Sequence, residues 1–171
     1  YAALGKTRFA SVRYGNVLGS RGSVLEVFKT QRRAGVVTIT DERMTRFCLS
    51  LERGVQLVLH ALEAMHGGEI FIPKIPSMRI VDLAAAAAPE CGVSVTGIRP
   101  GEKLHELLIN RYESRHCVEQ EDHYVIYPEF QEWESPRPAG TALPDGFEYA
   151  SDTNARWLTR AELLGMIGEQ K

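Results

Sequence analysis

Short runs of β-branched and aromatic residues alternate along this chain with longer segments whose apolar residues recur every three or four positions. The strand-like runs are Arg8–Tyr14 (RFASVRY), Val36–Thr40 (VVTIT), Glu69–Ile72 (EIFI), Val93–Ile98 (VSVTGI) and Tyr124–Tyr127 (YVIY). Strands that alternate with helices predict an α/β fold, because each connecting helix packs back onto the sheet. With 171 residues, 44% of them hydrophobic, the chain is long enough to bury a core.

Two helices are expected from capping-box patterns, in which a Ser or Thr is followed three residues later by Glu. Ser23 and Glu26 precede a helix expected over Val24–Arg33. Thr159 and Glu162 open a terminal helix that is expected to run through about residue 168. Both patterns predict that the hydroxyl accepts a hydrogen bond from the first turn of its helix.

The remaining helices are expected from apolar spacing alone. Ser50 can cap a central helix that ends at the Gly67-Gly68 pair. The i, i+3, i+4, i+7 spacing predicts that one stripe of this helix is buried, namely Val55, Val58, Leu59 and Leu62. Ser77–Ala88 and Leu104–Ile109 are expected to form two short helices, and Asp41–Phe47 (DERMTRF) a loop.

Charge and cysteine content exclude several classes of function. A formal net charge of −2 and a pI of about 6.2 offer no broad basic surface for a nucleic acid. The three cysteines are far apart and form no CxxC pair, which argues against a disulfide framework or a zinc knuckle. No apolar run approaches the roughly 18 residues that cross a bilayer. We therefore expect a cytoplasmic protein with no nucleic-acid partner and no membrane segment in this chain.

The glycine-containing stretch Arg13–Ser23 (RYGNVLGSRGS) lies between an expected strand and an expected helix. Its glycines stand at positions 15, 19 and 22, which is not the G-x-G-x-x-G spacing of a dinucleotide loop. A strand-to-helix junction nevertheless favours anions, because free backbone N–H groups and the positive end of the helix dipole meet there. The spacing alone leaves open a plain tight turn or a ligand-binding loop.

Three arginines and one glutamate are candidates for contacts to a phosphorylated ligand. Arg21, Arg46 and Arg99 each stand in a loop or at the end of an element, where a guanidinium can meet a phosphate in bidentate fashion. Each can also be an ordinary solvated arginine. Glu102 can accept hydrogen bonds from sugar hydroxyls or can simply stabilise the first turn of a helix.

A metal site is not expected. His105-Glu106 resembles the start of an HExxH zinc motif, but position 109 is Ile where the second His would stand. The five histidines are otherwise scattered along the chain. No nucleophile elbow of the Gly-x-Ser-x-Gly type is present either.

Four blocks of the chain, in this order, resemble the inverting UDP-N-acetylglucosamine 4,6-dehydratase family of extended short-chain dehydrogenase/reductases. The blocks are RYGNVLGSRGSV, ITDERMTRF, MHGGEIFIPKIPSM and GIRPGEKLHELLI, within residues 8–128, and FEYASDTNARWL resembles the end of the family's sequences. Four ordered blocks are far more specific than any one of them.

The resemblance implies a fold made of the last strands of a Rossmann-type parallel sheet plus a smaller α/β substrate-binding domain. Residues 1–65 would hold the Rossmann part with an excursion into the substrate domain, 66–130 mainly the substrate-binding domain, and 131–171 a connecting segment and the terminal helix. The family uses NADP to dehydrate UDP-N-acetylglucosamine with inversion at C5. The product is a UDP-4-keto-6-deoxy sugar for pseudaminic acid and related polysaccharide biosynthesis, and the parent protein is expected to be a homo-oligomer.

The resemblance also assigns roles to individual residues. Arg99 and Glu102 match a pair that holds the UDP portion. From charge and hydrogen-bond chemistry we expect Arg99 on the diphosphate and Glu102 on the ribose hydroxyls. Arg46 matches a substrate-binding arginine. The other residues expected to contact substrate are Asn16, Val17, Leu18, Gly19, Ser20 and Arg21, and those expected beside the cofactor are Tyr14 and Gly15.

Two features of the family are absent from this sequence. It has no glycine-rich NADP loop, and no tyrosine is followed four residues later by the lysine of the Tyr-x-x-x-Lys pair. We therefore expect the C-terminal portion of the enzyme, inactive alone, with no catalytic residue and with NADP bound mainly by the missing half. The alternatives are a retaining UDP-sugar 4,6-dehydratase of polysaccharide biosynthesis and a non-catalytic module that binds nucleotide sugars.

Overall fold

The computed structural model describes residues 7–20, 22–129 and 137–168. They form two compact units that interleave along the chain. Of the described residues, unit 1 comprises 7–14, 52–74, 107–129 and 137–149, and unit 2 comprises 15–20, 22–51, 75–106 and 150–168. Parallel strand pairs occur in both units, so the predicted α/β class is confirmed. The predicted division at residues 65 and 130 stays a prediction.

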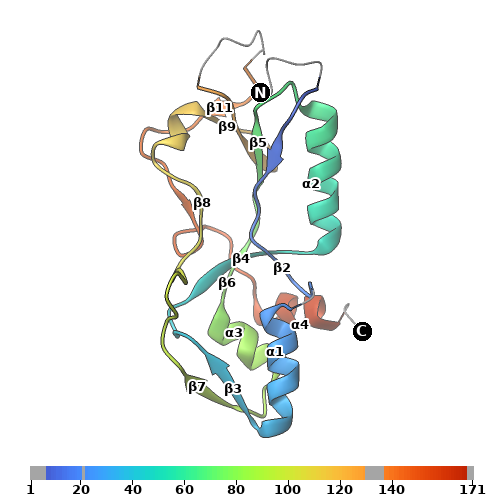
Figure 1. The fold of residues 1–171 in the computed structure, drawn as a ribbon, viewed down its shortest axis with the longest axis vertical. Helices are drawn as coiled ribbons and strands as arrows, with labels where there is room; N and C mark the ends of the chain where they lie inside the picture. Colours follow the sequence, from blue (N-terminus) through green and yellow to red (C-terminus); the bar gives the residue numbers. More distant parts are fainter. Residues whose placement is uncertain (1–6, 21, 130–136, 169–171) are drawn as a thin grey trace. The chain divides into compact units, whose positions relative to one another are not determined.

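Unit 1 is built on a five-stranded sheet in the order β1-β5-β10-β9-β11 (Figure 1). The strands are β1 (Ser11–Val12), β5 (Ile70–Pro73), β9 (Cys117–Glu119), β10 (His123–Ile126) and β11 (Thr141–Ala142). β1 pairs with β5 in parallel, whereas β10 and β11 pair with their neighbours in antiparallel fashion. The strand predicted over residues 8–14 is therefore confirmed only in its central two residues.

Helix α2 (Leu51–Ala64) lies along this sheet (Figure 1). Leu57 and Ala61 are buried with Phe71 of β5 and Val125 of β10. The prediction of the buried stripe was wrong: Val55, Val58, Leu59 and Leu62 are between 45% and 61% exposed. The helix instead buries its Gly54, Leu57 and Ala61 side.

The short helix predicted over Leu104–Ile109 is also wrong. Leu107–Ile109 form strand β8, which pairs with β12 (Tyr149–Ala150). A 3-10 helix, η2 (Glu113–His116), follows β8 in unit 1. The guanidinium of Arg13 forms a two-pronged ion pair with Glu113, 2.9 Å at each prong, and donates to the carbonyl of Leu108.

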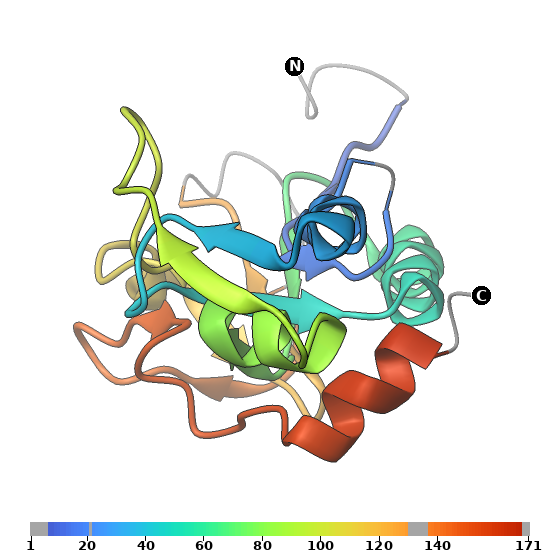
Figure 2. The same ribbon diagram turned by 90° about the horizontal axis from the view of Figure 1, so that it is seen from below.

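Unit 2 contains a three-stranded sheet in the order β2-β4-β6 and a parallel pair of β3 and β7. Figure 2 shows the β3–β7 pair with α3 beside it. The strands are β2 (Asn16–Val17), β3 (Val36–Ile39), β4 (Thr45–Leu49), β6 (Ser77–Arg79) and β7 (Gly92–Val95). The helices are α1 (Val24–Gln31), η1 (Arg32–Ala34), α3 (Ile80–Ala87) and α4 (Arg160–Gly168).

The core of unit 2 lies among α1, α3, α4 and these strands. Phe28 of α1, Leu83 of α3 and Leu163 of α4 are at most 1% exposed and belong to one cluster. Cys48 of β4 packs into the same cluster. The three cysteines are free, as the sequence predicted.

Two predictions within unit 2 need correction. The loop expected at Asp41–Phe47 contains the first residues of β4, because Thr45–Phe47 pair with Ser77–Arg79. For the same reason the helix expected from Ser77 begins only at Ile80. Both errors arise because each segment is a strand only in the presence of a partner that is remote in sequence.

The two capping-box patterns have different outcomes. At α4, the Thr159 backbone N–H donates to the Glu162 carboxylate at 2.8 Å, and the Glu162 N–H donates to the Thr159 hydroxyl at 3.3 Å. At α1, the Ser23 hydroxyl makes no capping hydrogen bond, and the Glu26 carboxylate accepts from the Gly22 N–H at 2.7 Å. The Thr159–Glu162 box at α4 is confirmed. The helix expected after Ser23 does begin at Val24, but the capping hydrogen bond expected from the Ser23 hydroxyl is not formed.

Candidate functional site

The stretch that follows Gly15 lines a pocket of about 240 Å³ in unit 2. Strand β2 supplies Asn16 and Val17, the turn after it supplies Gly19 and Ser20, and α1 begins at the pocket wall. The full lining is Asn16, Val17, Leu18, Gly19, Ser20, Gly22, Ser23, Val24, Leu25, Met78 and Leu83. The structure thus brings together five of the residues that the sequence nominated for substrate. Arg21, a sixth, lies outside the described residues.

The N-terminal turn of α1 gives this pocket a polar wall. Ser23 has an extended backbone, and its Oγ is buried without a hydrogen-bond partner among the described residues. A buried hydroxyl without a partner is costly unless a water or a ligand satisfies it. The N-terminal end of a helix also carries partial positive charge. The pocket wall is therefore suited to a polar or negatively charged group.

A tight turn at residues 99–102 carries two further candidates. The Glu102 N–H donates to the Arg99 carbonyl at 3.0 Å, and Gly101 has a φ of 82°, as a type II turn requires. The Glu102 carboxylate accepts from the Arg99 N–H at 3.2 Å and from the Thr40 hydroxyl at 3.3 Å. The Arg99 guanidinium is exposed and has no hydrogen bond or ion pair within the described part of the chain.

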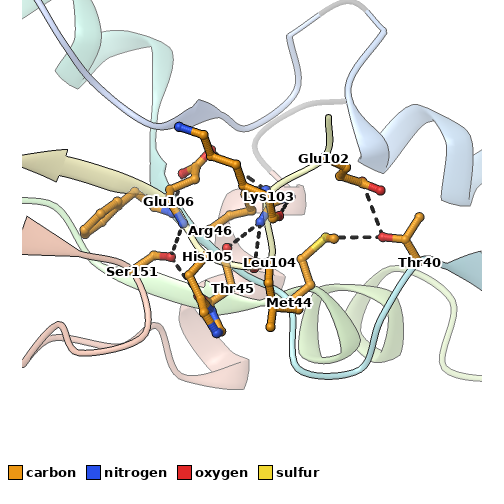
Figure 3. A network of polar contacts seen from close by, with 11 residues as sticks. Thr40, Met44, Thr45, Arg46, Glu102, Lys103, Leu104, His105, Glu106 and Ser151 are labelled. Atoms are coloured by element: carbon orange, nitrogen blue, oxygen red, sulfur yellow. Dashed lines mark hydrogen bonds and ion pairs between the residues drawn. The ribbon is translucent and has the colours of Figure 1, made fainter. Parts of the chain in front are cut away.

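Arg46 of β4 is placed differently. Its Nη1 donates to the carbonyls of Thr45 and Leu104, at 2.7 and 3.1 Å, and its Nη2 donates to the Lys103 carbonyl at 2.8 Å. Its side chain is only 12% exposed. Figure 3 shows the guanidinium directed toward the 103–104 backbone.

Residues that the sequence did not nominate surround Arg46 (Figure 3). The Glu106 carboxylate lies 3.8 Å from Nε of Arg46 and accepts from the Phe47 N–H at 3.0 Å. Burial raises the pKa of the Glu106 carboxyl, although these two groups act in the opposite direction. The Thr45 hydroxyl bonds to His105 Nδ1 at 2.8 Å and to the Ser151 hydroxyl at 2.7 Å. These contacts join distant segments, so no local motif could have revealed them.

The two residues proposed to lie beside the cofactor sit in different surroundings. Tyr14, the last residue of its segment of unit 1, is 39% exposed. Gly15 lies against β4: a Cβ placed on it would be 2.6 Å from the Phe47 carbonyl oxygen. The absence of a side chain at Gly15 is therefore explained by strand packing, without a ligand.

The described residues contain neither a metal-ligand cluster nor a membrane-spanning helix. No group of three or more His, Cys, Asp or Glu within residues 7–20, 22–129 and 137–168 could hold a metal ion. None of the helices in the described ranges is both long and apolar enough to span a membrane.

Known proteins resemble the chain over most of its length. It is 48% identical, over 95% of its length, to the inverting UDP-N-acetylglucosamine 4,6-dehydratase of Campylobacter jejuni, and covers 52% of that protein. It is 41% identical, over 71% of its length, to the UDP-glucose 4-epimerase of Rickettsia conorii, and covers 37% of it. The chain therefore spans about half the length or less of these relatives.

A solved structure confirms the fold, and a family model covers most of the chain. The X-ray structure of Pen from Bacillus thuringiensis matches with a TM-score of 0.83 and 31% identity, over 96% of this chain and 50% of Pen. The model described as "Polysaccharide biosynthesis protein" matches residues 2–128. By this match the chain belongs to the polysaccharide biosynthesis protein family.

Proposed function

We propose that this chain is the C-terminal, UDP-sugar-binding portion of an NADP-dependent UDP-N-acetylglucosamine 4,6-dehydratase. In the proposed reaction the substrate loses water and becomes a UDP-4-keto-6-deoxy sugar inverted at C5. The observation that carries the proposal is the 48% identity to the Campylobacter dehydratase over 95% of the chain. The chain alone is expected to be inactive, since half of that relative has no counterpart here.

The substrate is assigned to two features of unit 2. The α1 pocket offers the Asn16 amide and the hydroxyls of Ser20 and Ser23, which can bond to sugar hydroxyls or phosphate oxygens. The 99–102 turn offers the free guanidinium of Arg99 for the diphosphate, since a planar guanidinium pairs well with phosphate oxygens. Both carboxylate oxygens of Glu102 keep lone pairs for ribose hydroxyls, because each accepts only one hydrogen bond from the protein.

NADP is assigned mainly to a part of the longer protein that this chain does not include. A dinucleotide needs a glycine loop that lets its pyrophosphate approach a helix N-terminus, and no G-x-G-x-x-G sequence occurs here. Gly15 does not supply such a cradle, since Phe47 fills the space beside it. When bound, NADP would supply the hydride acceptor and donor of the dehydration. The residues of this chain contribute substrate binding.

The proposal extends to the cellular role. We assign the longer protein to the biosynthesis of pseudaminic acid and related surface sugars, as a cytoplasmic homo-oligomer. The sequence blocks shared with the inverting dehydratases support this assignment. Light scattering of the full-length protein tests the oligomer, and a single protomer mass would contradict it.

The activity is tested by incubating the full-length protein with UDP-N-acetylglucosamine and following the sugar by NMR. A 4-keto-6-deoxy product with inverted C5 is expected. Unchanged configuration at C5 would indicate a retaining dehydratase, and a product that keeps its 6-hydroxyl but is altered at C4 would indicate an epimerase. Binding of UDP-sugar without turnover would indicate a non-catalytic module.

Two variants test the assigned residues. Arg99→Ala is expected to raise KM for the UDP-sugar more than it lowers kcat, because the UDP contact exists in both the ground and the transition state. Ser23→Ala is expected to weaken UDP-sugar binding while leaving the free energy of unfolding nearly unchanged, since the hydroxyl bonds to nothing in the described structure. An unchanged KM in both variants would contradict the assignment.

A further inference from the structure

The guanidinium of Arg46 is almost fully occupied by the protein itself. Both N–H groups of Nη1 donate to carbonyls, one N–H of Nη2 donates to a third, and Nε faces the Glu106 carboxylate. A guanidinium has five N–H donors in total. Three of them therefore donate to backbone carbonyls, and Nε lies within ion-pair distance of the Glu106 carboxylate, among the residues drawn in Figure 3.

This arrangement leaves no edge of Arg46 open for two-pronged binding of phosphate. Bidentate recognition needs two parallel N–H groups along one edge of the fork. On the edge between the two Nη atoms, Nη1 has no N–H left. On the edge between Nε and Nη2, an incoming phosphate would meet the Glu106 carboxylate, 3.8 Å from Nε. Arg99 differs, because its guanidinium is exposed and without a partner in the described part of the chain.

Arg46 donates hydrogen bonds to the carbonyls of Lys103 and Leu104, which lie directly after the 99–102 turn. The same segment is bonded to β4 by the Thr45 N–H, which donates to the Leu104 carbonyl at 3.1 Å, and by the Phe47 N–H to Glu106. Beyond it, Glu106 and Ser151 exchange two hydrogen bonds of 2.8 Å. Residues 103–106 are therefore held on several sides, with Arg46 at the end nearest Glu102.

The turn is also attached to β3 on its upstream side. The Thr40 hydroxyl, at the end of β3, donates to Glu102 at 3.3 Å, and before the turn the Thr96 N–H donates to the Ile39 carbonyl at 2.9 Å. The residues from Gly92 to Gly101 are all exposed. Arg99 and Glu102 therefore lie on an exposed turn, and the contact of Arg46 with the Lys103 carbonyl attaches the backbone directly after Glu102.

We propose that Arg46 is a positioning residue, which fixes residues 103–104 so that Arg99 and Glu102 face the UDP moiety, and is not itself a ligand of the substrate. The proposal rests on the proposed function, because it takes the 99–102 turn to be the UDP-binding element. It replaces the direct substrate contact that the sequence resemblance implies for Arg46.

The test compares Arg46→Gln with Arg99→Gln in the full-length protein, with UDP and uridine as the ligands. Arg99→Gln is expected to weaken UDP binding and leave uridine binding unchanged, because it removes only a phosphate contact. Arg46→Gln is expected to weaken uridine binding as well, by about tenfold, which is the value of a charge-assisted hydrogen bond donated by a ribose hydroxyl to the Glu102 carboxylate. If Arg46→Gln weakens UDP binding but leaves uridine binding unchanged, Arg46 contacts the phosphates and the proposal is overturned.

Hydrogen exchange of the ligand-free protein provides a second readout. Arg46→Gln is expected to speed exchange at the amides of Thr45, Phe47 and Glu102, with no change in α1 or α4, whereas Arg99→Gln leaves all of them unchanged. Unchanged exchange at these three amides, or faster exchange throughout unit 2, would overturn the proposal. Arg46→Lys, which keeps the charge but not the fork, is expected to behave like Arg46→Gln and serves in its place if that variant does not fold.

The two readouts separate this proposal from the proposed function. If the wild-type protein binds neither UDP nor uridine, the UDP assignment fails, and with it the positioning role toward UDP. If the wild-type protein binds both ligands and the variants give the opposite pattern, only the role of Arg46 fails.

Discussion

Replacing Gly15 by Ala should destabilise unit 2, because β4 leaves no room for a methyl group there. The added Cβ would lie 2.6 Å from the Phe47 carbonyl oxygen, 2.9 Å from its carbonyl carbon, and closer still to its Cβ. Ordinary contacts of a Cβ atom lie at about 3.4–4 Å. None of these three atoms is the far end of a flexible side chain, so the backbone of β2 or β4 must move.

The cost can be bounded from the packing around Phe47. Its side chain is fully buried at 0% exposure, and its N–H is bonded to Glu106. Adding a methylene to a well-packed core costs about 1–3 kcal/mol. Because the strand pairing of Asn16 with Cys48 must shift as well, we expect Gly15→Ala to cost about 3 kcal/mol.

Equilibrium urea unfolding, followed by circular dichroism, measures this difference. Gly165→Ala in α4 is the matched control, because its methyl group would meet no atom within 4 Å. Alanine is the better helix former, so the control should gain about 0.5–1 kcal/mol. A Gly15→Ala protein as stable as wild type would refute the packing explanation and would favour a role for Gly15 in ligand binding.

Three further predictions concern stability, each read from urea unfolding. Thr159→Ala should cost about 1 kcal/mol, since the observed cap of α4 is lost, and a loss below the error of the measurement would contradict the cap. Arg13→Ala should lower the free energy of unfolding by about 2 kcal/mol, because it leaves the half-buried Glu113 carboxylate without its two-pronged partner. An unchanged midpoint of urea unfolding would contradict this, and would mean that water replaces the guanidinium at Glu113. Hydrogen bonding from His123 is the main cause that lowers the pKa of Asp122 to about 2. A depressed carboxyl pKa stabilises the fold above the unfolded pKa of about 3.9, and this contribution disappears as the pH falls toward 2. Asp122→Asn should therefore be less stable than wild type at pH 7 and as stable as wild type near pH 2. The difference at pH 7 should be at most about 1 kcal/mol, because the Asp122 side chain is 57% exposed. A difference that persists near pH 2 would show that it does not come from the ionised Asp122 carboxylate.

Elements with local signals were predicted well from the sequence. The run VVTIT predicted strand β3, and EIFI predicted β5, which is displaced by one residue. The Thr159 capping box predicted helix α4. In each case the defining interactions lie within a few residues of one another, or the run is apolar enough to be buried in any context. The sequence pattern therefore contains the information needed.

Elements that depend on remote partners were missed. Thr45–Leu49 is a strand because β6 and β2 lie on either side of it, and Leu107–Ile109 is a strand because Tyr149–Ala150 pairs with it. The polar residues around the first segment predicted a loop, and the apolar spacing around the second predicted a helix. Hydrogen bonding to a distant strand outweighed the local preference in both.

The central helix shows a different limit of sequence analysis. α2 is apolar on more than one side, so the spacing of Val55, Val58, Leu59 and Leu62 describes a real stripe but not the one that packs in this chain. Periodicity cannot choose between two apolar stripes. The stripe that packs is the one with Gly54, Leu57 and Ala61.

In the candidate site, too, the residues that are close in sequence were predicted and those that are remote in sequence were not. The residues of the α1 pocket follow one another in sequence, so the motif alone brought Asn16 to Ser20 together. The network of Thr45, Glu106 and Ser151 joins three segments, and only the fold reveals it. This network also places Arg46 against the protein, where a residue-by-residue resemblance had placed it against substrate.

The most direct test of the account is a ¹H–¹⁵N chemical-shift map of this chain during titration with UDP. The proposed binding site predicts shifts at the amides of Asn16–Ser20, of Gly22–Leu25 and of Arg99, Gly101 and Glu102, with unit 1 unchanged. Shifts confined to unit 1, or no shifts in a chain whose spectrum shows that it is folded, would contradict the claim that unit 2 binds the nucleotide sugar.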